Sequence, residues 1–207
     1  MKKKKKMSYC LSRELCGGVS LDFPRDMNEH GPPQLSGLCR VTRHLYISSC
    51  RAASDSSLVT SYGITCIINV TETESDRPPL PGVEYFHIPV SDSPDTRLSD
   101  HFDEVADKIQ STCERQGRTL VHCKAGVSRS ATLCMAYLMK YFSVPLSDAH
   151  IWVKSCRPRV RPNNGFWKQL IQYEKQLIGS NSIQMVTSSM GEIPDVYKEE
   201  VRDMIPL

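Results

Sequence analysis

The sequence predicts a single α/β domain in which helices flank a central, mostly parallel β-sheet. Its 207 residues suit one domain with tails, since domains typically have about 100–200 residues. A content of 40% hydrophobic and 24% charged residues is close to the globular average. Segments typical of buried strands alternate along the chain with segments of helical periodicity. That alternation is typical of a parallel or mixed sheet covered by helices.

Strands and a short helix are expected to alternate in the first half of the folded part. We expect a first strand over residues 41–47 and a short helix over residues 56–62. Residues 64–70, with the sequence ITCIINV, form a nearly continuous apolar run rich in β-branched side chains. Such a run is typical of a strand buried on both faces of a parallel sheet. After a proline-containing loop, residues 84–90 are expected to form another strand.

A helix with one buried face is expected after residue 98. Ser99 is the expected N-cap of this helix, and the acidic residues that follow it are favoured by the helix dipole. The apolar residues of the helix recur at helical spacing and make a single face: Phe102, Val105, Ala106 and Ile109. This face is expected to pack against the sheet.

One more strand and three helices are expected after residue 117. A strand over residues 118–122 precedes an almost wholly apolar segment, residues 131–139. That segment predicts a central helix that is packed on several sides. Two further helices are expected over residues 147–155 and 164–178, separated by a pair of prolines.

The chain is expected to have three parts. Residues 1–37 lack sustained periodicity, contain several glycine and proline turn signals, and are expected to form a flexible leader. Residues 38–179 are expected to form the folded domain. Residues 180–207 are less periodic, so we expect them to pack loosely on that domain or to extend away from it.

The charge of the chain gives no sign of a nucleic-acid partner. The formal net charge of +3 depends on five lysines at residues 2–6, without which the chain has a net charge of −2. Such a block is typical of a solvated tail. Nucleic-acid binding calls for basic residues spread over a folded face with aromatic residues among them. The sequence lacks that pattern, so we expect no nucleic acid to bind.

The sequence also predicts an intracellular protein without a transmembrane segment. It has no apolar run of about 18 residues, the length that a membrane-spanning helix needs. The lysine block is not followed by the apolar stretch of a signal peptide. The nine cysteines include no CxxC pair, which indicates free thiols in a reducing compartment.

The most informative segment is residues 121–130, VHCKAGVSRS, between an expected strand and the apolar helix. At such a turn the backbone N–H groups of the helix start point outward and bind anions. The residues between Cys123 and Arg129 can curl around a tetrahedral oxyanion such as phosphate. These loop residues are Lys124, Ala125, Gly126, Val127 and Ser128. The guanidinium of Arg129 would add a bidentate clamp on the same anion.

The loop predicts a nucleophilic reaction at Cys123. A thiolate near a helix N-terminus or a cation has a pKa of about 3.5–7.5, so Cys123 would be ionised at neutral pH. We expect its sulfur to attack phosphorus and to form a phosphocysteine that water then hydrolyses. Ser130 can donate a hydrogen bond to the thiolate and help it to leave in the second step. No metal or cofactor is expected, because the loop supplies the positive field.

A leaving alkoxide or phenolate needs a proton, so a carboxylic acid is expected elsewhere in the chain. Residues 91–95 form a turn-rich loop at the end of an expected strand. Open α/β sheets usually place functional residues at such strand ends. Asp92 is the first candidate for the acid, and Asp95 is the second.

Three polar residues are candidates for support of the site. His122 is expected to hold the loop through a hydrogen bond rather than to act as a base. Asn69 and Asn163 could tie the loops around the site or simply cap turns. The remaining histidines show no metal-ligand spacing, and we interpret them as structural or surface groups.

The motifs carry a resemblance to a known family. Residues 122–130 resemble the signature of the cysteine-dependent protein tyrosine phosphatases. The longer string HCKAGVSRSAT resembles the dual-specificity phosphatases in particular. The resemblance extends over residues 38–178 and includes Asn69, Asp92 and the string RPNNGFW at residues 161–167.

This resemblance implies a protein tyrosine phosphatase-like fold and a set of roles. It implies a phosphocysteine on Cys123, phosphate binding by residues 124–129 and proton donation by Asp92. Residues 136–141 and 154–158 resemble the small atypical members of the family. The lysine after Cys123 stands where that subgroup usually has alanine, a departure that could alter substrate preference.

The resemblance also implies phosphorylated proteins as partners, with phosphate on tyrosine, serine or threonine. Mitogen-activated kinases are a family-level candidate, and the subgroup implies a cytoplasmic, nuclear or mitochondrial location. Three alternatives stay open: a non-catalytic phosphoprotein-binding module on the same fold, sulfur transfer of the rhodanese type, and action on RNA 5′-phosphates or phosphoinositides. An accessible thiolate is also prone to oxidation, and the cysteines considered as its disulfide partner are Cys39, Cys50, Cys66 and Cys134.

Overall fold

The computed structural model describes residues 37–73, 79–189 and 191–202, and the expected leader with its lysine block lies outside them, apart from residue 37. A five-stranded sheet of order β1-β2-β5-β3-β4 forms the centre. All neighbouring strands are parallel except β1 and β2. The strands are β1 (Cys39–Arg40), β2 (Leu45–Ser49), β3 (Cys66–Asn69), β4 (Glu84–His87) and β5 (Thr119–Cys123). The expected α/β class with a mostly parallel sheet is therefore confirmed.

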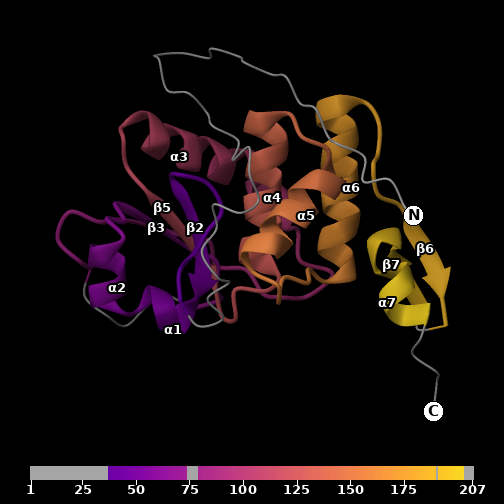
Figure 1. The fold of residues 1–207 in the computed structure, drawn as a ribbon, viewed down its shortest axis with the longest axis horizontal. Helices are drawn as coiled ribbons and strands as arrows, with labels where there is room; N and C mark the ends of the chain where they lie inside the picture. The colour runs from indigo at the N-terminus through magenta and orange to yellow at the C-terminus, as the bar shows by residue number, and fades with distance from the viewer. Residues whose placement is uncertain (1–36, 74–78, 190, 203–207) are drawn as a thin grey trace, which may run out of the picture.

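Helices cover both faces of this sheet (Figure 1). Because side chains alternate along a strand, Leu120 of β5 packs on one face with Ala52 and Val59. Val121 faces the larger core on the other side. The helices are α1 (Cys50–Ala53), α2 (Ser56–Ser61), α3 (Phe102–Glu114), α4 (Arg129–Phe142), α5 (Leu146–Cys156), α6 (Asn164–Ile178) and α7 (Lys198–Arg202). The first two lie on the side of Leu120, and α3 to α6 supply the larger core.

The central position of α4 explains its almost wholly apolar sequence. Every residue from Arg129 to Met139 is buried, because this helix packs against α3, α5, α6 and the sheet. The strand before it, β5, is buried along its whole length between β2 and β3. The parallel register places Ser49 beside Cys123, and Asn69 beside the preceding residue of β5. The carboxyl ends of three strands thus meet where α4 begins.

The expected strand over residues 41–47 is wrong in its first half, because the chain reverses there. β1 and β2 form an antiparallel pair on either side of a tight turn. The hydroxyl of Thr42 accepts hydrogen bonds from the backbone N–H groups of His44 at 3.2 Å and Leu45 at 3.1 Å. A threonine that bonds the backbone two and three residues ahead stabilises a turn and competes with an extended strand.

Two element boundaries also differ from expectation. Ser99 is not the N-cap of α3: it lies inside a 3₁₀ turn, η2 (Leu98–His101), and α3 begins only at Phe102. Ser99 is the second residue of this turn, so its backbone N–H needs an acceptor from outside the turn. The side chain of Gln169 in α6 accepts that hydrogen bond at 2.7 Å. The expected strand over residues 84–90 ends at His87, where β4 ends. The expected buried face of α3 is confirmed.

The described part of the chain beyond α6 packs on the domain, contrary to the expectation of a loose or extended tail. It forms a hairpin of β6 (Met185–Ser188) and β7 (Gly191–Pro194), followed by a 3₁₀ turn, η3 (Asp195–Tyr197), and α7. Ile193, Tyr197 and Val201 are buried in the main core. Apolar residues spaced over several short elements lack the sustained period of one long helix or strand. The burial of these three residues could therefore not be recognised from the sequence pattern.

A buried histidine in α5 leads to a prediction about acid stability. His150 contacts the ring edges of Trp167 and Tyr197, at centroid distances of 5.0 and 5.7 Å. Burial lowers its pKa to about 4, with a smaller lowering from Lys154 and an opposing effect of Glu200. Below about pH 6.5 the His150 side chain is therefore protonated in the unfolded chain, whereas it stays neutral in the folded chain until the pH approaches 4. Folding stability from this group is present above pH 6.5 and is lost as the pH falls toward 4.

We expect His150→Phe to weaken this acid dependence while keeping the aromatic packing. Between pH 7 and pH 5, its free energy of unfolding should fall by about 1–2 kcal/mol less than that of the wild type. Urea denaturation at both pH values measures the difference. His101→Gln changes a histidine beside Glu104 near the surface and serves as the control. If the free energy of unfolding fell equally in wild type and His150→Phe between pH 7 and pH 5, His150 would not be a source of the acid dependence.

Candidate active site

The candidate nucleophile stands at the end of the central strand. Cys123 is the last residue of β5, and residues 124–128 form a loop that ends where α4 begins. Gly126 lies in the middle of this 124–128 loop with a φ of +68°. A Cβ there would collide with the backbone carbonyl of Ser48 on β2. Only glycine therefore permits the loop to curl this closely over the sheet.

Hydrogen-bond donors converge on the sulfur of Cys123. Its Sγ accepts from the backbone N–H of Gly126 at 3.2 Å and from the hydroxyl of Ser130 at 3.3 Å. Burial alone would raise the pKa of Cys123, but the Ser130 hydroxyl and the N–H groups of Ser130, Val127 and Gly126 lower it below its ordinary value. The lowered pKa of Cys123 agrees in direction with the expectation from the sequence. Donors that bond the charged form favour it, so the site stabilises a thiolate.

Arg129 and Asp92 lie beside each other next to this loop. The guanidinium of Arg129 is buried, and its Nη1 donates to the carbonyl of Val90 at 2.8 Å. Its Nε is 3.6 Å from Oδ2 of Asp92 and has no hydrogen-bond partner within the described part of the chain. A buried donor without a partner carries an energetic penalty. The arrangement therefore favours an additional acceptor at this place.

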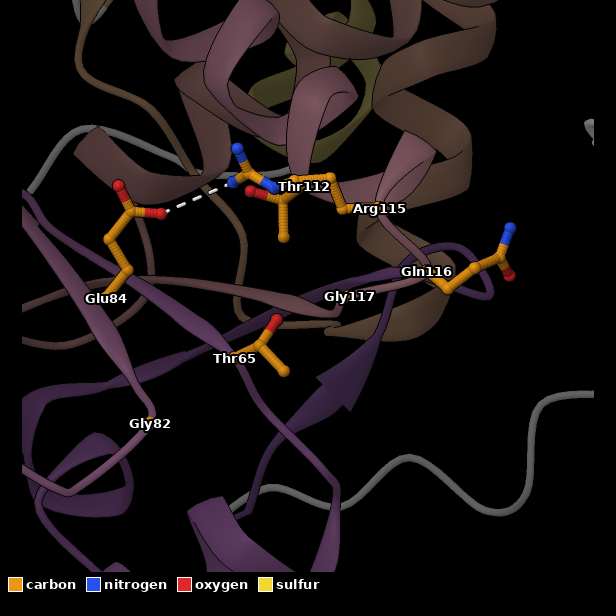
Figure 2. A pocket seen from close by; sticks show the side chains of 7 residues that line it. All are labelled: Thr65, Gly82, Glu84, Thr112, Arg115, Gln116 and Gly117. Carbon is orange, nitrogen blue, oxygen red and sulfur yellow. Dashed lines mark hydrogen bonds and ion pairs between the residues drawn. The ribbon is translucent and has the colours of Figure 1, made fainter. Parts of the chain in front are cut away.

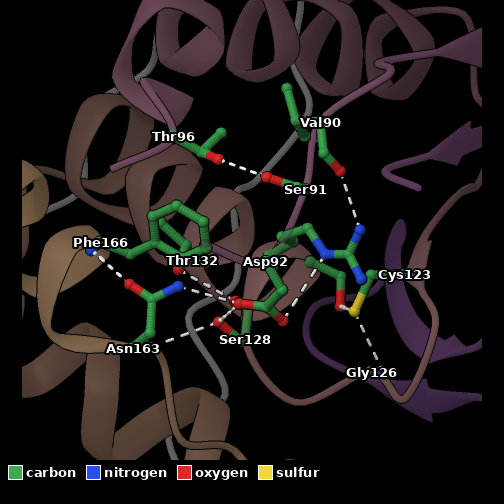
Figure 3. Close-up of polar contacts among 12 residues, drawn as sticks. Val90, Ser91, Asp92, Thr96, Cys123, Gly126, Ser128, Thr132, Asn163 and Phe166 are labelled. Carbon is green, nitrogen blue, oxygen red and sulfur yellow. Dashed lines mark hydrogen bonds and ion pairs between the residues drawn. The ribbon is translucent and has the colours of Figure 1, made fainter. Parts of the chain in front are cut away.

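Two donors from different elements orient Asp92. Figure 3 shows its carboxylate between Ser128 and Asn163. Oδ1 accepts from the Ser128 hydroxyl at 2.7 Å and from Nδ2 of Asn163 at 2.9 Å. The same Asn163 caps α6, with its Oδ1 accepting from Phe166 N at 3.0 Å. Asp95 is exposed, and its carboxylate contacts none of these groups.

The remaining support candidates and the loop residue Lys124 lie near the site and make different contacts. The Asn69 side chain bonds the loop after its own strand, accepting from Thr71 Oγ1 at 2.7 Å and donating to the Thr73 carbonyl at 3.4 Å. His122 is buried, and burial lowers its pKa to about 4, so its ring is neutral at pH 7. Lys124 is exposed at the surface of the 124–128 loop.

Sequence reasoning missed the groups that hold the loop from outside the motif. The backbone N–H of Arg161 donates to the Val127 carbonyl at 2.9 Å, and that of Cys50 donates to the Lys124 carbonyl at 3.3 Å. Arg157 bonds two further carbonyls of the loop. Basic residues are frequent in this part of the sequence, and nothing in their spacing distinguishes a buried arginine from an exposed one.

A cavity of about 350 Å³ lies at the opposite, amino-terminal edge of the sheet. Figure 2 shows its lining side chains, with Arg115 directed toward Glu84. The two are 3.4 Å apart, and Lys108 also pairs with Glu84. The hydroxyl of Thr65 accepts from the backbone N–H of Arg118 at 3.0 Å. These polar groups already have partners, and the cavity is remote from Cys123.

Neither a metal-binding cluster nor a membrane-spanning helix occurs among the residues that the structure describes. Within these residues, no group of three or more histidine, cysteine, aspartate or glutamate side chains could hold a metal ion. Among the helices of the same residues, none is long and apolar enough to cross a membrane. None of the seven cysteines in the described chain is joined to another of them by a disulfide bond.

The chain is similar to known phosphatases over most of its length. The family model "Dual specificity phosphatase, catalytic domain" matches residues 45–176. Dual specificity protein phosphatase 18 of Homo sapiens is 54% identical over 175 residues, which are 84% of this chain and 93% of that protein. Dual specificity protein phosphatase 21 of Homo sapiens is 49% identical over 175 residues, 84% of this chain and 92% of that protein.

A solved structure has the same fold. The crystal structure of human DUSP28 aligns with a TM-score of 0.65 at 37% sequence identity, covering 71% of this chain and 96% of that one. The family match spans well over half of the chain and includes Cys123, Arg129 and Asp92. The expected resemblance is therefore confirmed. The chain belongs to the dual specificity phosphatases, protein phosphatases that hydrolyse phosphoric monoesters.

Proposed function

We propose that this phosphatase works through a phosphocysteine on Cys123 and acts on phosphotyrosine as well as phosphoserine and phosphothreonine. The observation that carries the proposal is the convergence of donors on the Cys123 sulfur, beside a buried arginine whose Nε has no hydrogen-bond partner among the described residues. The N–H groups of the 124–128 loop and the guanidinium of Arg129 bind the phosphoryl oxygens.

In the first step the thiolate of Cys123 attacks phosphorus while the bond from phosphorus to the ester oxygen breaks. Asp92 donates a proton to that oxygen, which leaves as a neutral alcohol or phenol. The hydrogen bonds from Ser128 and Asn163 keep Asp92 beside the loop.

In the second step water attacks the phosphocysteine and the bond between sulfur and phosphorus breaks. The carboxylate of Asp92 takes a proton from the water, and inorganic phosphate is released. The electron pair of the broken bond returns to sulfur as a thiolate. The Ser130 hydroxyl, 3.3 Å from that sulfur, stabilises the charge as it forms.

The finer partner and location assignments are also proposals. Phosphorylated mitogen-activated kinases are the candidate substrates, on the strength of family membership. The proposed location is the cytoplasm and the nucleus, with mitochondrial association as a subgroup property. Lys124, exposed next to the nucleophile, is proposed to bias the pocket toward substrates with acidic neighbours.

Hydrolysis of matched phosphopeptides in EDTA and reductant tests the proposal. We expect release of phosphate from phosphotyrosine and from phosphothreonine peptides of one sequence. Activity on phosphotyrosine alone would contradict the dual specificity, and dependence on added metal would contradict the mechanism. Thiosulfate, a phosphoinositide and a 5′-triphosphorylated RNA serve as parallel substrates. Faster turnover of any of these would replace a phosphoprotein as the proposed substrate.

Ser130→Ala is expected to slow the second step more than the first. The first step needs the thiolate as an attacking group, whereas the second needs it as a leaving group that the hydroxyl stabilises. With p-nitrophenyl phosphate, rapid mixing should then show a burst of nitrophenol that is stoichiometric with enzyme, followed by a steady rate about tenfold or more below wild type. A lowered rate without any burst would show that Ser130 acts only before the phosphocysteine forms.

A further inference from the structure

Arg157 is a buried cation directly behind the 124–128 loop. It follows α5, and only 2% of its surface is exposed. Its Nε donates to the Gly126 carbonyl at 2.7 Å, and its Nη2 donates to the Ala125 carbonyl at 3.0 Å. Its Nη1 lies 3.4 Å from the sulfur of Cys39. In the described chain no carboxylate forms an ion pair with Arg157, so the loop carbonyls provide its main compensation.

These two carbonyls belong to the peptide units that face the nucleophile. A trans peptide unit is planar, and its carbonyl and N–H point in opposite directions. The Ala125 carbonyl shares its unit with the Gly126 N–H, which donates to Cys123 Sγ at 3.2 Å. The Gly126 carbonyl shares the next unit with the Val127 N–H, which contributes to the lowered pKa of Cys123. Arg157 therefore holds the rear of the same two units whose front faces Cys123.

We propose that Arg157 is a positioning residue for the phosphatase reaction, which orients these two peptide units so that their N–H groups point at the Cys123 sulfur and the phosphoryl group. It acts through the loop and touches neither the substrate nor the sulfur. Its effect on turnover rests on the proposed function, whereas its effect on the Cys123 thiolate rests on the geometry alone.

The guanidinium suits this role better than an ammonium group would. Its planar fork reaches two adjacent carbonyls at once, while a lysine offers one point of contact at a time. A carbonyl bonded to a cation is also polarised, which strengthens the N–H of the same unit as a donor. Other polar or titratable groups near Cys123 are Arg129, Ser130 and Cys134 of α4, Asp92 of the loop after β4, and its chain neighbours His122 and Lys124. These groups stay unchanged when Arg157 is replaced.

The test compares Arg157→Met and Arg157→Lys with the wild type and with Arg159→Met. Arg159 lies two residues away and is exposed, so its replacement controls for the loss of one positive charge. The pH dependence of iodoacetamide alkylation gives the pKa of Cys123. The chain has nine cysteines, so alkylation is followed by mass spectrometry on the peptide that contains Cys123. Thermal unfolding reports whether each variant is folded, and p-nitrophenyl phosphate gives kcat/KM.

We expect Arg157→Met to raise the pKa of Cys123 by about one unit and to lower kcat/KM by about 10- to 100-fold. Arg157→Lys should fall between Arg157→Met and the wild type, and Arg159→Met should match the wild type. A folded Arg157→Met or Arg157→Lys with the wild-type pKa of Cys123 would overturn the proposal. If Arg157→Met does not fold, Arg157→Lys alone decides.

The two proposals fail in different ways. A wild-type protein that is inactive on every phosphate ester would refute the proposed catalysis, and the alkylation series would still decide the role of Arg157. An active wild type with no pKa difference among the folded variants would refute only the positioning role.

Discussion

Cys123→Ser is expected to abolish turnover of p-nitrophenyl phosphate and of phosphopeptides, with a loss of at least about 10⁴-fold in kcat. The serine hydroxyl has nearly the same shape, but it is not ionised under conditions in which the site stabilises a thiolate. The donors that lower the pKa of Cys123, led by the Ser130 hydroxyl, cannot make an alkoxide available at neutral pH. Initial rates in EDTA and reductant measure the effect.

Binding should survive this substitution, because the 124–128 loop and Arg129 remain in place. Cys123→Ser is expected to bind a phosphopeptide in a fluorescence titration and to release no phosphate from it. Cys113→Ser, a buried cysteine of α3 remote from the loop, should keep wild-type activity and serves as the matched control. Full activity in Cys123→Ser would remove the nucleophile from the mechanism.

Asp92→Asn is expected to slow the reaction in proportion to the need of the leaving group for a proton. Asparagine can still accept the hydrogen bonds from Ser128 and Asn163, but it has no acidic proton to give. With phenyl phosphate or an alkyl phosphate, kcat should fall by about 10²–10³-fold. With p-nitrophenyl phosphate, whose product leaves readily as an anion, the loss should be much smaller. Steady-state kinetics over the substrate series measure the dependence.

Asp95→Asn provides the control for this experiment. Asp95 lies in the same loop, exposed, with its backbone N–H 3.4 Å from the Ser93 hydroxyl. Its replacement should leave the series of rates unchanged. If Asp92→Asn kept the wild-type kcat for every substrate of the series and Asp95→Asn lost activity on the poor leaving groups, Asp95 would be the acid instead.

The contiguous part of the site could be predicted from the sequence. Cys123, the 124–128 loop and Arg129 follow one another between a buried strand and an apolar helix, so local spacing determines their geometry. The alternation of strands and helices likewise predicted the mostly parallel sheet, because each pattern follows from the burial of a single element. Tertiary structure was not needed for either conclusion.

The remaining parts depend on contacts between residues that are distant in the chain. The bond between Asp92 and Asn163 joins the loop after β4 to the start of α6. Arg157 reaches the loop from the end of α5, and its sequence neighbourhood does not reveal its burial. Two local hydrogen bonds to Thr42 stabilise a turn between β1 and β2 at a place where the sequence predicted a continuous strand. Such contacts follow from how elements pack, which the periodicity of one element does not specify.

Detection of the phosphocysteine itself tests the proposed mechanism most directly. Wild type and Ser130→Ala are mixed with a phosphotyrosine peptide, quenched with acid during turnover, and digested for mass spectrometry. We expect one phosphoryl group on the peptide that contains Cys123, with more of it in Ser130→Ala because the second step is slower. Continued turnover with no phosphoryl group on Cys123, or with one on another residue, would contradict that mechanism.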